Sequence, residues 1–372
     1  MRSVAVGIMS FRNRTGGMPF AETGYFRQSL QAAKKLSMRA FVFCPLDIDW
    51  RSRSIYGYVY DDAAGAWQAK HFPFPDVVYD RLFPPRGRLA NLLFAAAKRL
   101  RTQGQVQMFG RAFRGKWEVY SALAKHDDVK EHLPETRPLH KLADLDLLLR
   151  KHGYVFVKPD MGSQGAGVVS IRATTNGYRC RGRNHRNVPY AVNTHSLAHV
   201  LAVAKSASMR RRLLVQQGLE LSFLQGRTFD VRAVVQKDHE GKWQLTGAAV
   251  RIGRPGSVTS NLHGGGHAAR PEALLKRAFP ASYSEIMETL VRLALRIPAV
   301  IDQELGRYGE LGLDFGVDNN GKIWLIEANS KPGRTVFLRT GDYALRRTSI
   351  ARPMQYSRYL ALQKRSGGEE VV

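Results

Sequence analysis

Two apolar runs near the C-terminal end of the chain, joined by a turn, restrict the fold more than any other feature. The runs cover residues 311–317 and 322–328, and the turn reads Asp-Asn-Asn-Gly at 318–321. An Asn-Gly pair between two apolar runs is typical of a β-hairpin. We therefore predict a hairpin of two antiparallel strands at this point.

Three oxygen-bearing side chains lie on this predicted hairpin. Side chains alternate along a strand, so the same-face neighbours of Asp314 are Gly312 and Gly316, which leave room for a bulky charged group. Glu327 and Asn329 share a face of the second strand, and the hairpin can bring that face beside Asp314. Hard oxygen ligands without thiolate or imidazole suit Mg²⁺. The alternative is a solvated hairpin face, but the apolar strand interior favours a metal site.

A glycine-rich turn follows a strand-like run that ends in a lysine. Residues 155–157 are apolar, Lys158 follows them, and residues 162–167 read Gly-Ser-Gln-Gly-Ala-Gly. Glycines allow backbone N–H groups to approach an anion, and the lysine adds a positive charge. The residue order of a Walker A loop is missing, and the turn leads into a strand where a dinucleotide-binding loop would lead into a helix. Alone, the turn is equally compatible with a structural role; together with the oxygen cluster it predicts a phosphate site.

Two supporting segments lie between these features. Residues 213–217 form an apolar strand that leads into a polar turn at 218–220, which suits hydrogen bonds to a purine edge. Farther on, Asp230 and Arg232 share one strand face, and Arg251 precedes a glycine-rich stretch, 253–266, that contains Asn261. A single such arginine is most often an ordinary surface residue. An arginine aligned with a phosphate site, however, is well shaped to stabilise phosphoryl charge.

The order of elements predicts an α/β fold with several lobes. A chain of 372 residues is long enough for two or three lobes. Its beginning alternates between strand-like runs, at 4–9 and 39–43, and a helical run at 23–36, which indicates a parallel sheet. Two further strand-like runs follow at 55–60 and 77–79, and a long amphipathic helix is expected at 283–305. We predict an N-terminal α/β lobe (1–110), a central lobe with the glycine-rich loop (111–210), a C-terminal lobe with the oxygen cluster (211–345) and a basic tail (346–372). The last two lobes are expected to be α+β sandwiches.

The charge balance is strongly positive. Lysines and arginines number 57 against 31 aspartates and glutamates, a formal net charge of +26. Such a surface attracts polyanions such as nucleic acid, anionic envelope polymers or an acidic substrate. The basic clusters at 179–186, 210–212 and 346–358 contain no recognisable nucleic-acid-binding motif. General solubility or non-specific polyanion affinity is therefore favoured over a dedicated nucleic-acid site.

Location can also be predicted from the sequence. No run approaches roughly 18 consecutive apolar residues, so we expect no membrane span. The N-terminal run is too short and too soon polar for a signal peptide. Cys44 and Cys180 are the only cysteines and lack metal-type spacing, which predicts a reducing, cytoplasmic environment without a disulfide framework.

The motifs in this order resemble the ATP-grasp superfamily. They are Lys-Pro with the glycine-rich loop, Gln-Gln-Gly with a following Glu, Asp-Val-Arg, Arg with a following Asn, Asp, and Ile-Glu-Ala-Asn-Ser-Lys-Pro-Gly. More narrowly, Lys-Trp-Glu at 116–118, Leu-Pro-Glu-Thr at 133–136, Thr-Ser-Asn-Leu at 259–262 with three glycines at 264–266, and Glu-Ala-Asn at 327–329 resemble the YheC/YheD group, associated with endospore coats in bacilli. The resemblance covers about residues 116–333.

The resemblance implies an ATP-grasp fold and a role for each matching position. Lys116 and Lys158 would contact the ATP phosphates, and Arg232, Arg251 and Asn261 would stabilise the transferred phosphate. Asp314, Glu327 and Asn329 would hold Mg²⁺, with Mn²⁺ as the alternative ion. The loop over the triphosphate would comprise Gly162, Ser163, Gln164, Gly165 and Gly167, and the adenine hinge Gln216, Gln217, Gly218 and Leu219, with Glu220 near the ribose.

The implied activity is that of an ATP-dependent carboxylate–amine ligase working through an acyl phosphate. The basic surface suits an acidic peptide or polymer as the unidentified carboxylate substrate, and the resemblance implies association with the forming spore coat. Two alternatives stay open at this point. One is a non-catalytic nucleotide-binding structural protein of the spore; the other is a polyanion-binding module with a vestigial ATP site, which the filled lysine, arginine and carboxylate positions disfavour.

Overall fold

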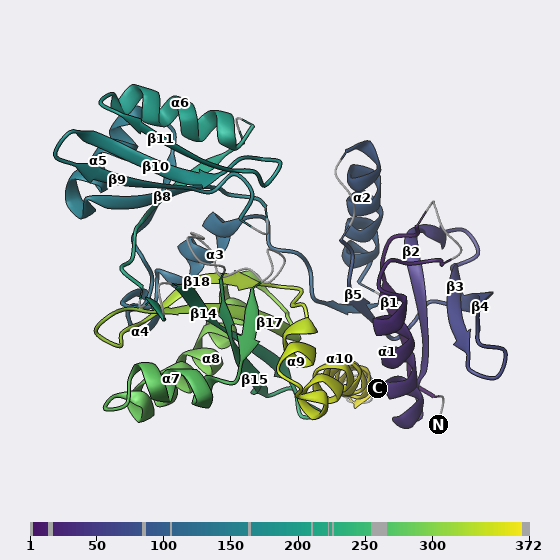
Figure 1. The fold of residues 1–372 in the computed structure, drawn as a ribbon. Helices are drawn as coiled ribbons and strands as arrows, with labels where there is room; N and C mark the ends of the chain where they lie inside the picture. Colours follow the sequence, from purple (N-terminus) through teal and green to yellow (C-terminus); the bar gives the residue numbers. More distant parts are fainter. Residues whose placement is uncertain are drawn as a thin grey trace.

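The chain folds around three β-sheets with helices packed against them (Figure 1). The computed structural model describes residues 3–13, 18–83, 87–104, 106–162, 165–209, 211–221, 223–224, 227–253 and 266–366. Figure 1 shows an N-terminal lobe on one side, while a middle sheet lies above a C-terminal sheet on the other. The predicted α/β fold class is confirmed.

The N-terminal sheet is parallel at its centre, as predicted. Strand β1 pairs in parallel with β2 and β5, and β5 with β6, whereas β2, β3 and β4 form an antiparallel meander. Every residue of β1 is buried, as expected for a strand covered on both faces. Strands β4 and β6 are absent from the predicted elements because β4 is mostly exposed and β6 is short. The elements are β1 (Ala5–Met9), α1 (Thr23–Lys35), β2 (Arg39–Asp49), β3 (Ser54–Asp61), β4 (Ala66–Pro73), β5 (Val77–Asp80), α2 (Arg88–Thr102) and β6 (Gln107–Phe109).

The middle sheet is antiparallel, with the strand order β11-β10-β9-β8-β12-β7. Two helices pack against one face, where Leu148, Val155, Cys180 and Val200 share a core. The other face is turned towards the C-terminal sheet (Figure 1). The elements are β7 (Thr136–Leu139), α5 (Leu142–His152), β8 (Tyr154–Pro159), β9 (Val169–Thr174), β10 (Gly177–Arg183), β11 (Pro189–Thr194), α6 (Leu197–Ala207) and β12 (Leu213–Gln217).

The C-terminal sheet packs against a long helix, α8, whose apolar residues recur at helical spacing. Ile286, Leu290, Leu293 and Ile297 face the sheet and are buried in its core, and the predicted helix at 283–305 is confirmed. The sheet order is β16-β15-β14-β17-β18, with β13 paired to β14. The elements are α3 (Lys116–Leu123), α4 (Asp127–Lys130), β13 (Phe223–Leu224), β14 (Arg227–Lys237), β15 (Trp243–Ile252), β16 (His267–Ala269), α7 (Pro271–Ala278), α8 (Tyr283–Leu305), β17 (Glu310–Val317), β18 (Ile323–Asn329) and α9 (Thr335–Arg339).

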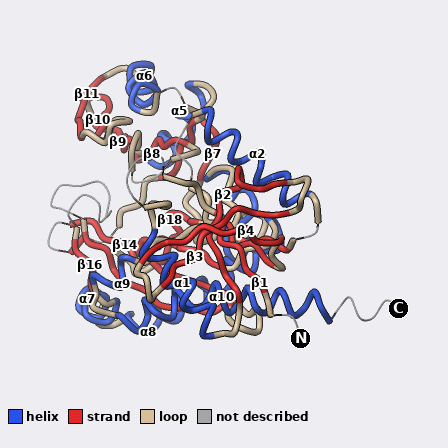
Figure 2. Tube along the Cα trace, turned by 90° about the vertical axis from the view of Figure 1, so that its right-hand side faces the viewer, coloured by secondary structure: helices blue, strands red, loops and turns tan. Residues whose placement is uncertain are grey.

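The segment predicted to be a basic tail is largely a packed helix. Helix α10 (Tyr343–Ser366) lies beside α1, and Met354, Tyr356 and Leu360 are buried in the N-terminal core (Figure 2). Arginines interrupt these apolar positions in the sequence, which hides the helical pattern. None of the helices in the described ranges is apolar enough over a sufficient length to cross a membrane.

The lobe boundaries drawn from the sequence also differ from the sheet boundaries. The boundary at 210/211 assigns β12 to the C-terminal lobe, yet β12 pairs with β7 and β8 of the middle sheet. The predicted central lobe contains helices α3 and α4, but Val119 and Val129 of these helices pack in the C-terminal core. The division of the chain into independently folding domains stays a prediction.

Candidate functional site

The predicted hairpin is confirmed, and it brings the three oxygen-bearing side chains together. In the pairing of β17 with β18, Asp314 lies opposite Glu327, and Gly312 lies opposite Asn329. The register shifts by one residue immediately after Asp314, as in a β-bulge, a feature common beside active sites. The amide Nδ2 of Asn329 lies 3.4 Å from Oδ2 of Asp314.

Two arginines hold Asp314. Arg232 lies opposite Asp314 on β14, and its guanidinium donates to both carboxylate oxygens, with Nη2 2.8 Å from Oδ2. Nη2 of Arg251 lies 3.1 Å from Oδ1 of Asp314, and Arg251 also makes two bonds of 2.6 Å to Asp230. Burial opposes ionisation of Asp314, but the two guanidinium charges outweigh it and lower the pKa of this carboxyl group. Both predicted arginines thus converge on the predicted metal cluster.

The glycines beside Asp314 do not leave the open space expected from the sequence. A Cβ on Gly312 would lie 3.0 Å from Pro332 and 3.5 Å from Arg232, and a Cβ on Gly316 would lie 2.6 Å from the Leu221 side chain. Protein side chains therefore fill the room on this strand face. Gly312 allows Arg232 to approach the carboxylate, and Gly316 makes room for Leu221.

Lys116 links the glycine-rich turn to the oxygen cluster. It is the first residue of α3, and its Nζ lies 2.9 Å from the carbonyl oxygen of Gly162 and 3.3 Å from Oε1 of Glu327. Asp160, which the sequence reasoning missed, fixes this helix start. Its carboxylate accepts the backbone N–H of Trp117 at 2.8 Å, and its carbonyl accepts the N–H of Lys116 at 3.0 Å. The only sequence signal for Asp160 is its place directly after the Lys-Pro pair.

Lys158 and Gln216 line the opposite wall of the same cleft. Nζ of Lys158 donates to Oε1 of Gln216 at 2.8 Å, and Nε2 of Gln216 donates to the hydroxyl of Thr136 at 2.8 Å. Burial and, to a lesser extent, the charge of Lys116 outweigh the opposing charge of Glu327 and lower the pKa of Lys158 to about 8. The cleft is completed by Tyr120 and Leu123 of α3 and by residues 325–328 of β18. It is therefore an apolar slot with two cations and a carboxylate at one end.

The predicted adenine hinge lies at the edge of this cleft. The N–H of Gln217 donates to the carbonyl of Glu135 at 2.7 Å, and that of Gly218 to the carbonyl of Tyr154 at 2.8 Å. These two backbone N–H groups are therefore occupied. A purine edge would have to bond to other backbone groups of the turn, and Leu219 is the next residue that carries them. The carboxylate of Glu220 pairs with Arg172 at 2.7 Å.

The glycine-rich turn adopts backbone conformations that favour glycine. The φ angles are +151° at Gly162, +75° at Gly165 and +76° at Gly167. A Cβ on Gly167 would also lie 3.1–3.3 Å from atoms of residues 159, 207 and 208. Three predicted site residues, Ser163, Gln164 and Asn261, lie outside the residues that the structure describes.

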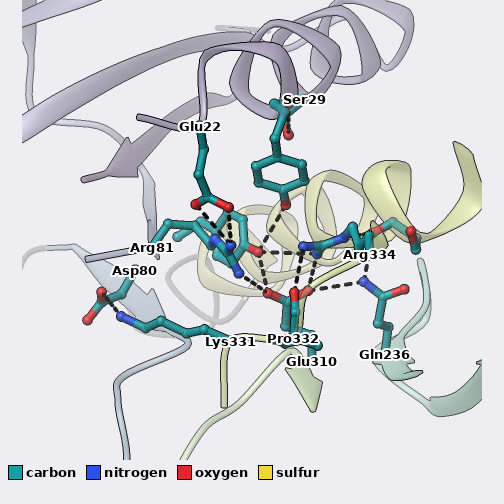
Figure 3. A network of polar contacts seen from close by, with 12 residues as sticks. Glu22, Ser29, Asp80, Arg81, Gln236, Glu310, Lys331, Pro332 and Arg334 are labelled. Atoms are coloured by element: carbon teal, nitrogen blue, oxygen red, sulfur yellow. Dashed lines mark hydrogen bonds and ion pairs between the residues drawn. The ribbon is translucent and has the colours of Figure 1, made fainter. Parts of the chain in front are cut away.

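A buried polar network braces the loop that follows Asn329 (Figure 3). Nζ of Lys331 donates to Oδ1 of Asp80 at 2.6 Å and to the carbonyl of Leu82 at 2.9 Å. Arg334 pairs with Glu310, which is fully buried. The other donors to Glu310 are Tyr79 Oη, Arg81 Nη1 at 3.3 Å and Gln236 Nε2 at 3.1 Å. Sequence reasoning missed this network, which ties the segment after the oxygen cluster to the N-terminal lobe.

Comparisons with known proteins identify the family and relatives of this chain. The family model described as YheC/D like ATP-grasp matches residues 105–360. The endospore coat-associated protein YheD of Bacillus subtilis (strain 168) is 30% identical over 345 residues, which is 92% of this chain and 75% of YheD. The endospore coat-associated protein YheC of the same organism is 24% identical over 324 residues, 86% of this chain and 87% of YheC.

A solved structure has a similar fold. The D-alanyl-alanine synthetase A of Vibrio cholerae O1 biovar eltor str. N16961 superimposes with a TM-score of 0.55 over 97% of this chain and 99% of that chain. Its sequence identity to this chain is 13%, so this similarity concerns the fold alone.

Proposed function

The chain belongs to the YheC/D-like ATP-grasp family, and from this premise we propose that it is a ligase that uses ATP to join a carboxylate to an amine. The observation that carries the proposal is the cleft between the middle and C-terminal sheets. There Lys158, Lys116 and Glu327 lie around one slot, with Asp314 and two arginines on the adjoining strands. Cations beside oxygen ligands are what a nucleoside triphosphate with a divalent ion requires.

In this proposal the nucleotide lies in the slot. Lys158 and Lys116 bind the phosphates, and the glycine-rich turn, including Ser163 and Gln164, covers them. Residues 216–219 border the adenine, and Glu220 reaches the ribose. The apolar residues of β18 and α3 that line the slot support this orientation, since a purine ring needs apolar walls.

Asp314, Glu327 and Asn329 would hold Mg²⁺ or Mn²⁺. Their oxygen atoms suit such an ion. Within the described residues no three acidic, histidine or cysteine side chains converge on one point, so the set needs the amide oxygen of Asn329. The oxygens of Asp314 are already held by Arg232 and Arg251, and an ion at Asp314 would compete with Arg232. When bound, the ion would neutralise phosphate charge.

The chain's residues would position two successive steps. In the first, a carboxylate oxygen attacks the γ-phosphorus and ADP leaves, which gives an acyl phosphate. In the second, the amine nitrogen attacks the acyl carbon, phosphate leaves and the nitrogen loses a proton. Arg232, Arg251 and Asn261 would stabilise the transferred phosphoryl group, and no protein nucleophile is needed. The paired contacts of Arg251 to Asp230 and Asp314 would hold its guanidinium in place.

The carboxylate substrate is proposed to be acidic, because the formal net charge of +26 favours such a partner. Cytoplasmic location is proposed because both cysteines are free and buried, in separate lobes. Association with the spore coat is proposed from the names of the two relatives.

A second function, nucleotide binding without turnover, is favoured by one observation. Arg232 and Arg251 already occupy the carboxylate oxygens of Asp314 that a metal ion would need. The carboxylate is therefore arranged as in a structural ion pair. Mass-spectrometric assay of ADP release, with ATP, Mg²⁺ and pooled acidic carboxylates and amines, separates the two functions. A ligase releases ADP over many turnovers only with both co-substrates, because the carboxylate alone stops at the acyl phosphate, and the Lys158→Ala variant releases none. Tight ATP binding without ADP release would support the structural role.

A further inference from the structure

The middle sheet contains a long segment without acidic residues. Between Asp160 and Glu220 the sequence has no aspartate or glutamate, although it has nine lysines and arginines; all 31 acidic residues lie elsewhere or at these two limits. This segment forms β9, β10, β11 and β12 of the middle sheet and helix α6, which packs against it. General solubility does not require such segregation, because interspersed charges of both signs serve it equally well.

Three arginines of this segment lie side by side on the uncovered face of the middle sheet, and we call them the arginine row. Arg179 on β10 lies directly opposite Arg172 on β9, and Arg181 lies two residues along β10 on the same face. The intervening Cys180 is fully buried against the helices, so the three arginines point away from the core. All three are exposed.

The arginine row is short of acidic partners. Arg172 pairs with Glu220 at 2.7 Å, and its guanidinium lies 4.0 Å from the centre of the Tyr154 ring. Within the part of the chain that the structure describes, Arg179 and Arg181 have no ion pair. Like charges on facing strand positions destabilise a sheet. The arginine row therefore lowers the stability of the sheet, and a bound anion would restore it by neutralising the repulsion.

The row lies on the same sheet face as the candidate nucleotide site. Tyr154 on β8 pairs with Arg172, and Lys158 shares the face of Tyr154 because it is four residues farther along the strand. Strands β8 and β10 are two strand spacings apart, about 10 Å. This face is turned towards the C-terminal sheet (Figure 1). A chain lying along the row therefore approaches the end of the cleft that contains Lys158.

We propose that the arginine row binds an acidic polypeptide, with successive carboxylates paired to Arg179 and Arg181. Alternate side chains of an extended peptide are about 7 Å apart, which is the spacing of these arginines along β10. Guanidinium groups also bind carboxylates through paired hydrogen bonds. That this polypeptide supplies the carboxylate for ligation rests on the proposed function; its binding does not.

The surroundings of the row favour polypeptide over nucleic acid. Single-stranded nucleic acid sites combine basic grooves with exposed aromatic side chains on which bases stack. On β9, β10 and β11, the described residues of this face are serine, threonine, glycine, arginine, proline, alanine and asparagine, and Tyr178 and Tyr190 pack against the covered face. On the neighbouring strand β8, Tyr154 and Phe156 share the face of the row, but both are partly buried and the Arg172 guanidinium covers the Tyr154 ring.

Fluorescence anisotropy with a labelled poly-L-glutamate peptide tests the proposal on the full chain without ATP. The test variant is Arg179→Gln/Arg181→Gln. The control, Lys276→Gln/Arg277→Gln, removes two exposed charges from α7, in a different lobe. We expect the test variant to weaken binding by about five- to tenfold and the control by less than about twofold. Equal loss in both variants would mean general electrostatic attraction and would overturn the proposal.

Two further arms separate the causes of failure. A single-stranded oligonucleotide with the same number of charges should bind more weakly than the peptide; tighter, row-dependent binding would make nucleic acid the partner and refute the polypeptide assignment. The Lys158→Ala variant should retain peptide binding while losing ATP affinity, so peptide binding tests the row and ATP affinity tests the nucleotide site. If the Arg179→Gln/Arg181→Gln variant binds ATP as tightly as the native chain, the variant is folded.

Discussion

At the scale of single residues, Lys158 combines a positive charge with burial. Its ammonium group donates to the neutral amide oxygen of Gln216, and burial lowers its pKa to about 8. The folded pKa lies below the ordinary value of about 10.4, so the unfolded chain binds more protons between these values. The contribution of Lys158 to the free energy of unfolding therefore rises with pH through this window. The reason is that the folded chain disfavours the charged form of this side chain.

This pKa predicts proton uptake when ATP binds. The phosphates favour the charged ammonium, so binding near pH 8 should take up protons, and affinity should fall between about pH 7 and about pH 9. Calorimetry in two buffers of different ionisation enthalpy measures the uptake. The Lys158→Arg variant, which keeps its charge throughout this range, should bind ATP with less uptake. Identical heats in both buffers for the native chain would contradict the assignment.

At the scale of elements, the glycine-rich turn depends on glycine at position 167. A side chain there would meet both an unfavourable φ of +76° and atoms of residues 159, 207 and 208. We predict that Gly167→Ala lowers the free energy of unfolding by about 1–3 kcal/mol and weakens ATP binding, because the turn must shift. Urea unfolding and calorimetry measure the two effects.

The matched control for this prediction is Gly153→Ala in the same lobe. Its φ is +66°, but a Cβ there would meet no atom within 4 Å. This variant should share the backbone penalty and leave ATP affinity unchanged. If both variants bind ATP as the native chain does, the turn at 162–167 does not contact the nucleotide.

How far each element could be predicted depends on the pattern of its side chains. The hairpin of β17 and β18, the strand β12 and the helix α8 carry regular apolar patterns, and each appears where the sequence places it. Strand β10 alternates arginines with tyrosine, cysteine and glycine, and α10 carries arginines between its buried residues. Such elements are stabilised by the burial of a few apolar residues against other parts of the chain. The local spacing of apolar residues does not reveal these contacts.

The candidate site was predictable in part for a related reason. Asp314, Glu327 and Asn329 share a local hairpin, so strand alternation and the turn locate them together. The contact of Arg251 with both Asp230 and Asp314 depends on the pairing of three strands far apart in sequence. The Glu310 network joins segments more than two hundred residues apart, and only the tertiary structure brings them together.

At the scale of the whole molecule, the Glu310 network fixes the N-terminal lobe against the C-terminal sheet. Glu310 is fully buried and has donors from both lobes. Glu310→Ala leaves the buried Arg334 without its carboxylate and Arg81 with Glu22 as its remaining acidic partner, so we predict a loss of about 3–5 kcal/mol in the free energy of unfolding. Urea unfolding measures it. Asp128→Ala, which removes the exposed pair with Arg296, should have a much smaller effect. Similar losses for both variants would contradict this role.

The central claim concerns a nucleotide site completed by a metal ion at Glu327. Calorimetric titration with ATP, in Mg²⁺ and in EDTA, tests it in the native chain, in Glu327→Gln and in the control Glu304→Gln. Glu304 pairs with Lys125 and His126 and does not line the cleft. We predict that Mg²⁺ tightens ATP binding about tenfold or more in the native and control proteins and that Glu327→Gln loses most of this gain. ATP affinity in Mg²⁺ that is the same in Glu327→Gln as in the native chain would contradict the assignment.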